Sequence, residues 1–162
     1  MKKGNSSILL TVLGATIGAV SAGAAVSNKS EKKIKKYTEL ADKHFAIMKL
    51  YDQWLLTKQE GKSLAEYLTK EGIHSIAIYG LSFVGERLYD ELVDSDIEIK
   101  YGIDKNADHI YSEIDMINPE GEYGTVDAII VTAVFYFDEI ASMLEEKTDI
   151  KVLSLEDILN DM

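Results

Sequence analysis

Residues 73–85 read IHSIAIYGLSFVG, and this stretch decides the fold. It opens with a short apolar run that leads directly into Gly80, which is typical of a buried parallel strand. Apolar side chains then recur at Val84, Leu88 and Leu92, the spacing of a helix that packs on a sheet. A strand, a tight glycine turn and a helix in this order predict the first unit of a parallel α/β sheet.

The same alternation of strands and helices continues to the end of the chain. A short helix precedes the first strand, and its start at Ser63-Leu-Ala-Glu66 has the form of a capping box. We therefore predict an α/β domain over residues 61–162, a Rossmann-like three-layer unit with a mainly parallel sheet. We expect its other strands at 97–103, 114–117, 126–133 and 150–153, and its later helices at 137–147 and from 154 onward.

The glycine turn gives the first indication of a ligand. Gly80, Ser82 and Gly85 occupy the three glycine places of the G-x-G-x-x-G fingerprint, with serine in the middle place. In that fingerprint the first glycine makes the tight turn and the third lets the helix pack closely on the strand. The N–H groups at the helix N-terminus then bind a phosphate. Asp104 ends the next predicted strand, where an acid commonly accepts a hydrogen bond from a ribose hydroxyl.

A further polar residue, Thr132, ends the strand predicted at 126–133, at the edge where open α/β sheets bind their ligands. An alternative stays open, in which the domain has lost its ligand and keeps its glycines for packing. The predicted ligand-binding residues are Gly80, Leu81, Ser82, Phe83, Val84, Gly85, Asp104 and Thr132.

Other chemistries find little support in the sequence. Tyr101 and Lys105 have the spacing of the short-chain dehydrogenase pair, but they straddle a predicted strand end instead of lying on a helix. The three histidines are scattered, and there is no cysteine to supply a thiolate. We therefore predict neither catalytic residues nor metal ligands, and we expect Arg87 to pair on the surface with Asp90 or Glu91.

The N-terminal part of the chain has a different character. Residues 8–26 carry no charge, a length close to that needed to cross a bilayer, and lysines flank them on both sides. The lysines that follow favour a single-pass anchor over residues 1–28, with the rest of the chain in the cytoplasm at the cell membrane. Two alternatives stay open: a cleaved signal peptide with an A-x-A site at residues 22–24, and a glycine- and alanine-rich helix that inserts poorly into a membrane.

Residues 29–60 are predicted to form a long helix, because apolar positions recur at a spacing of three or four residues, with His44 in the place between Ala41 and Met48, and no Gly or Pro interrupts them. Two interpretations stay open: a stalk that pairs two copies of the chain, and an amphipathic helix packed back on the domain. The apolar positions are Ile34, Tyr37, Ala41, Met48, Tyr51 and Leu55.

The charge distribution bears on possible partners. The net charge of −11 combines +6 over residues 1–36 with −17 over residues 37–162. Because an acidic body repels nucleic-acid phosphates, we expect no nucleic-acid partner for the main domain.

Four segments of the domain are similar to a known family. Residues 73–160 resemble the Rossmann-like, nucleotide-sugar-binding-type modules of bacterial surface-polysaccharide proteins, such as the N-terminal domains of certain sugar O-acyltransferases. The whole chain looks like bacterial proteins that place such a module after a membrane helix. The resemblance rests on IAIYG at 76–80, GERLYDEL at 85–92, YGIDKN at 101–106 and VDAIIVT at 126–132.

The resemblance implies binding rather than catalysis. In the acyltransferases the glycine turn and the acid after the next strand contact a nucleotide-sugar, and Gly80, Ser82, Gly85 and Asp104 match those places. The left-handed helix that carries acyl transfer there is absent from this sequence. We therefore expect a membrane-anchored cytoplasmic module that binds a nucleotide or nucleotide-sugar and assists a glycan-synthesis partner protein. Two alternatives are an NAD(P)-dependent oxidoreductase or epimerase-like subunit and a ligand-free structural adaptor.

Overall fold

A computed structural model gives the backbone of residues 5–162 and the side chains of residues 30–162. Its centre is one sheet of five strands in the order β3-β2-β1-β4-β5, and every neighbouring pair of strands is parallel. This order confirms the predicted α/β class and is compatible with a Rossmann-like arrangement. The strands are β1 (Ser75–Tyr79), β2 (Glu98–Ile103), β3 (Met116–Ile117), β4 (Ala128–Val131) and β5 (Lys151–Ser154).

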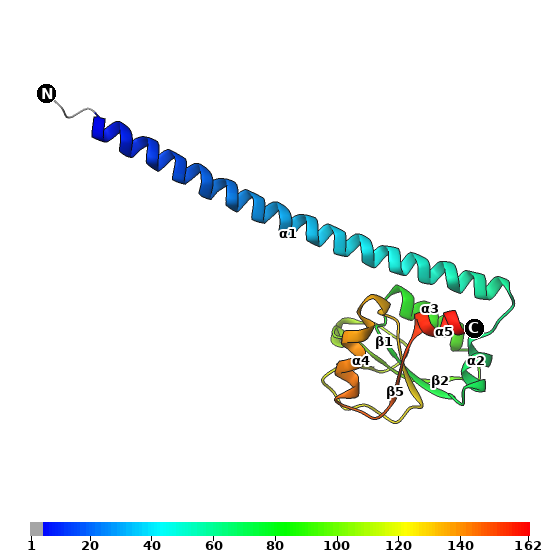
Figure 1. Cartoon of the computed structure of the whole chain (residues 1–162). Coiled ribbons are helices and arrows are strands. Elements are labelled where there is room, and N and C mark those ends of the chain that lie inside the picture. The colour runs from blue at the N-terminus through cyan, green and yellow to red at the C-terminus, as the bar shows by residue number, and fades with distance from the viewer. Residues whose placement is uncertain (1–4) are drawn as a thin grey trace. The chain divides into compact units, whose positions relative to one another are not determined.

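Helices cover both faces of the sheet (Figure 1). On one face α2, α3 and α5 pack on the sheet together with the last turns of α1, and on the other face lies α4. The helices are α1 (Asn5–Gln59), α2 (Leu64–Lys70), α3 (Phe83–Leu92), α4 (Phe137–Glu145) and α5 (Leu155–Asp161), with single 3-10 turns at Ala107–His109 and Val134–Tyr136. The three layers follow from β1 and β4, whose side chains are buried on both faces.

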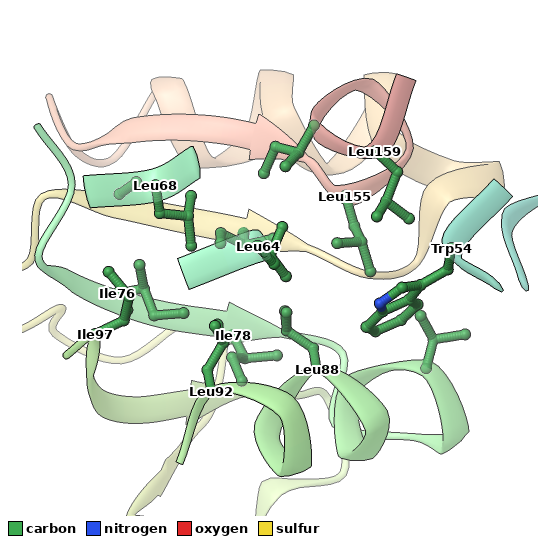
Figure 2. Packing of buried hydrophobic residues seen from close by; sticks show 14 of the residues in the cluster. Trp54, Leu64, Leu68, Ile76, Ile78, Leu88, Leu92, Ile97, Leu155 and Leu159 are labelled. Carbon is green, nitrogen blue, oxygen red and sulfur yellow. The ribbon is translucent and has the colours of Figure 1, made fainter. Parts of the chain in front are cut away.

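Figure 2 shows the larger of the two cores, between the sheet and helices α2, α3 and α5. Leucines from the three helices meet isoleucines from β1, and the indole of Trp54 packs at one end of this cluster. Serine side chains cap the starts of two of these helices. The Ser63 hydroxyl accepts a hydrogen bond from Glu66 N at the start of α2, and Ser154 caps α5 in the same way.

The end of α1 belongs to the α/β unit. That compact unit runs over Phe45–Met162, so it begins earlier than the boundary at residue 61 taken from the sequence pattern. Leu50 and Trp54 are buried, and the Trp54 indole donates to Glu91 Oε2 at 2.7 Å. Lys58 pairs with the other oxygen of the same carboxylate at 2.6 Å. For this part of α1, the structure therefore shows a helix packed on the domain.

Of the apolar stripe that suggested a stalk, only Tyr51 packs against the core of the compact unit. Within the compact unit, Met48 and Leu55 are exposed, whereas Leu50 and Trp54 are buried. The reason is that α1 carries apolar residues around more than one face, so spacing alone does not choose between the faces.

The predicted anchor at residues 8–26 lies outside the residues whose side chains the structure describes. Within the part of the chain that is described, none of the helices has the length and apolar character that crossing a bilayer requires. The choice between an anchor and a signal peptide therefore stays a prediction from the sequence.

Candidate functional site

Strand register brings the predicted site residues to one edge of the sheet. Tyr79, the last residue of β1, pairs with Ile103 of β2 and with Val131 of β4. The next residues along the three strands, Gly80, Asp104 and Thr132, therefore lie side by side at the carboxyl edge. This is the edge at which open α/β sheets bind ligands.

Gly80 makes the tight turn that its place in the motif predicts. Its φ is +90°, a left-handed conformation that residues with a side chain rarely adopt. Its N–H donates to Ile103 O at 2.8 Å, and its carbonyl oxygen lies 2.6 Å from the Thr132 hydroxyl. A Cβ at Gly80 would also come within 3.0 Å of that hydroxyl oxygen. The turn is therefore held from both neighbouring strands and requires glycine.

Gly85 allows the first turn of α3 to approach the end of β1. A Cβ at this position would overlap the Gly80 carbonyl oxygen and would lie 3.1 Å from the Gly80 carbonyl carbon. Because these are backbone atoms of the turn, no side-chain rotation relieves the overlap. The third glycine of the motif therefore serves helix–strand packing, as the fingerprint predicts.

The N-terminus of α3 presents polar groups beside this turn. Ser82 is its N-cap residue, but the serine hydroxyl makes no capping hydrogen bond. The first N–H groups of an α-helix have no partner within the helix, and together with the helix dipole they favour an anion. The arrangement can hold a phosphate group.

An open cleft of about 750 Å³ lies at this edge of the sheet, within the usual range of ligand sites of about 300–1,000 Å³. The glycine turn and the segment after β2 form part of its wall, and α4 contributes apolar side chains. The lining includes Tyr79, Gly80, Ser82, Asp104, Ile140 and Met143.

Asp104 is fixed at the rim of the cleft. Its Oδ1 accepts a hydrogen bond from Asn106 N at 2.9 Å, and its own N–H donates to Ile117 O at 3.1 Å. These bonds hold the carboxylate half-buried at the end of β2. A carboxylate held in this way can accept hydrogen bonds from ligand hydroxyl groups.

The eight predicted residues fall into three groups. Gly80, Ser82 and Asp104 line the cleft. Phe83 is 82% exposed and is not among the residues that line the cleft. The others are buried in the packing around the turn rather than in the cleft wall: Leu81, Val84, Gly85 and Thr132.

Thr132 has a structural role that the sequence did not indicate. It is 3% exposed, and its hydroxyl lies within hydrogen-bond distance of the Gly80 and Tyr79 carbonyl oxygens. The hydroxyl thus ties the end of β4 to the glycine turn. Its contribution to a ligand site is to hold that turn in place.

Sequence reasoning missed Tyr79 and the wall that α4 supplies. Tyr79 read as one more apolar strand residue, although its position directly before Gly80 was a usable signal. Ile140 fitted an ordinary apolar position of the helix predicted at 137–147, and Met143 was not singled out. Their places in the cleft depend on how α4 crosses the sheet, which spacing along the chain does not fix.

A second hollow, of about 450 Å³, lies around the start of α4. Its lining includes the carboxylates of Asp138, Glu139, Glu156 and Asp157 and no lysine or arginine. Because four carboxylates repel an anion, this hollow is unsuited to a phosphate. The cleft beside Gly80 is the better candidate site.

Comparisons of the chain with protein-family models, with curated proteins and with solved structures found no match. The fold and the site together define an α/β protein with an open cleft at the carboxyl edge of a parallel sheet. The proposals below therefore rest on the geometry and chemistry of this chain.

Proposed function

We propose that residues 45–162 form a module that binds a nucleotide or a nucleotide-sugar in the cleft beside Gly80. The observation that carries the proposal is that one cleft is lined by Gly80, by Ser82 at the N-cap of α3 and by Asp104. A phosphate suits the helix N-terminus, and a sugar hydroxyl suits the carboxylate. A Rossmann-like fold with a phosphate-binding turn is the finer interpretation that this geometry supports.

The charges in the cleft favour a ligand with both a phosphate and an uncharged part. Asp104, Glu120 and Glu139 line the cleft, and Lys105 is the one basic residue in that lining. Away from the helix N-terminus the wall therefore repels phosphate but accepts hydrogen bonds from hydroxyl groups. A nucleoside or sugar ring in that part of the cleft satisfies both conditions.

The proposal extends to the rest of the chain. Residues 8–26 would hold the module at the cytoplasmic face of the cell membrane, in support of a partner protein of surface-glycan synthesis. The lysine-flanked apolar run and the resemblance of residues 73–160 support this part. Within the compact unit, Phe45, Met48 and Leu55 are exposed on α1, which is compatible with pairing of two copies.

The direct test is isothermal titration calorimetry of the full chain in a mild detergent. The probes are one UDP-, one GDP-, one dTDP- and one CMP-sugar, with NADH and NADPH alongside. We expect at least one nucleotide-sugar to bind. Binding of NADH or NADPH alone would instead favour the oxidoreductase alternative, and no binding by any probe would favour the structural adaptor.

A pair of variants places the bound ligand. Asp104→Asn should weaken binding about tenfold or more, because the ligand then loses a charge-assisted hydrogen bond. Asp96→Asn is the matched control, since Asp96 is exposed just before the opposite end of the same strand. If the two variants bind equally well, Asp104 does not contact the ligand and the proposed cleft is wrong.

A further inference from the structure

Among the buried side-chain polar atoms of the described residues, the hydroxyl oxygen of Tyr79 has no hydrogen-bond partner. The side chain belongs to the core beneath α4, and the residue is only 5% exposed. Leaving a buried hydroxyl without a hydrogen bond costs about 1–3 kcal/mol, so such groups are rare in folded proteins. The exception at Tyr79 therefore calls for a physical reason.

Two tyrosines of the same core show how such a hydroxyl is normally satisfied. Tyr101 donates to Gly124 O at 2.7 Å, and Tyr123 donates to Pro119 O at 2.6 Å. The hydroxyls of both tyrosines therefore have a hydrogen-bond acceptor although their rings pack in the core. Tyr79 differs from them in lining the cleft, where it is the residue directly before Gly80.

The Tyr79 hydroxyl is protonated at neutral pH, as an ordinary tyrosine hydroxyl is, and its surroundings raise its pKa further. Burial raises its pKa above the ordinary value, and the nearby Tyr123, Asp104 and Glu120 raise the pKa further. A protonated phenol has one hydrogen to donate and requires an acceptor. Because two of these neighbours carry carboxylates, a phosphate oxygen is a poor acceptor at this place, whereas an uncharged oxygen suits it.

We propose that the Tyr79 hydroxyl donates a hydrogen bond to an uncharged oxygen of the nucleoside or sugar part of the ligand. This inference rests on the proposed function, and it makes Tyr79 a specificity-determining residue of that cleft. The phosphate lies at the start of α3, and the uncharged part extends past Tyr79 toward the apolar side chains Ile140 and Met143. A site built to make such a hydrogen bond discriminates against a ligand that lacks the acceptor.

The test compares two tyrosine-to-phenylalanine variants of the full chain in detergent, titrated with the same four nucleotide-sugars. Tyr79→Phe keeps the ring and removes the unpartnered hydroxyl. We expect it to bind the recognised nucleotide-sugar about three- to tenfold more weakly, the range for one neutral hydrogen bond. Its melting temperature without ligand should stay equal to that of the wild type or rise.

Tyr101→Phe is the matched control, because it removes a hydroxyl that is already bonded to Gly124 O and does not line the cleft. We expect its melting temperature to fall and its affinity to stay at the wild-type value. The corresponding nucleotide without its sugar (UDP, GDP, dTDP or CMP) separates the two possible acceptors. If Tyr79→Phe weakens binding of both ligands, the acceptor is on the nucleoside, and if it weakens binding of the nucleotide-sugar alone, the acceptor is on the sugar.

The outcomes separate this inference from the proposed function. If the wild type binds a nucleotide-sugar and Tyr79→Phe binds it equally well, the inference is overturned and the proposed function stands. If the wild type binds none of the four probes, the proposed function fails and the inference fails with it. A fall in melting temperature for Tyr79→Phe without ligand would also overturn the inference, because it would show that the hydroxyl is already satisfied within the protein.

Discussion

Replacing Gly85 by alanine tests the packing that shapes the site. The added Cβ would overlap the Gly80 carbonyl oxygen and lie 3.5 Å from Ile78 Cγ2, so the turn or the start of α3 must move. Overpacking of this kind costs about 1–3 kcal/mol, and the upper end applies because the atoms displaced are backbone. Alanine regains about 1 kcal/mol through its better helix propensity. The expected net loss of stability is therefore about 2 kcal/mol.

This loss can be measured by thermal unfolding of the full chain, followed by the fluorescence of its one tryptophan, Trp54, which is buried in the compact unit. For a unit of about 120 residues, a 2 kcal/mol loss lowers the melting temperature by about 8 °C. The control is Asp90→Ala, which removes an exposed ion pair on the same helix and should cost less than about 1 kcal/mol. A Gly85→Ala variant as stable as the wild type would refute the close approach of α3 to the glycine turn.

Two further predictions concern polar groups at the ends of elements. Ser63→Ala removes a capping hydrogen bond and should lower the free energy of unfolding in urea by about 1 kcal/mol. Ser82→Ala removes no such bond and should change this free energy by less than about 0.5 kcal/mol. Equal losses for the two variants would contradict the assigned caps. Hydrogen bonds from His74 N and from the N–H and hydroxyl of Ser75 hold the pKa of Asp127 below its ordinary value. The stability that these bonds confer is present above the unfolded-state pKa of Asp127 and is lost as the pH falls through its folded-state pKa. In urea unfolding at a series of decreasing pH values, the difference in unfolding free energy between the wild type and Asp127→Asn should therefore shrink. A difference that stays constant with pH would contradict this assignment.

Much of the architecture could be predicted because it depends on local chemistry. The apolar run before Gly80, the periodic stripe of α3 and the serine at the start of α2 each identify an element without knowledge of its neighbours. The predicted surface pair of Arg87 is also confirmed, since its guanidinium lies 3.0 Å from Asp90 Oδ2. The alternation of these elements then leaves few topologies other than a parallel sheet.

The site was harder to predict from the sequence because it depends on contacts between distant segments. Thr132 lies at the predicted edge, but only the register of β1 and β4 shows that its hydroxyl is directed at the turn. The sequence shows that Tyr79 directly precedes Gly80, but it does not show that the Tyr79 hydroxyl lacks a hydrogen-bond partner, because that is a property of the folded packing. For the same reason, the helical periodicity of α1 did not reveal that Trp54 faces Glu91.

The start of β4 also depends on a contact between segments that are distant in the sequence. The sequence placed this strand at 126–133, whereas its ladder covers Ala128–Val131. Asp127 leaves the strand pattern because its carboxylate caps the start of β1 at His74 and Ser75. Apolar character extends beyond the hydrogen-bonded ladder at both ends, so composition alone overestimates the length of the strand.

The central claim is that a phosphate-bearing ligand sits in the cleft beside Gly80. The most direct measurement is a ¹⁵N–¹H correlation spectrum of the full chain, titrated with the four nucleotide-sugars. Binding at this place predicts the largest shift changes at the amides of Gly80, Ser82, Phe83 and Val84, with smaller changes around Asp104. Shift changes confined to other parts of the chain, or none with any of the four ligands at millimolar concentration, would contradict it.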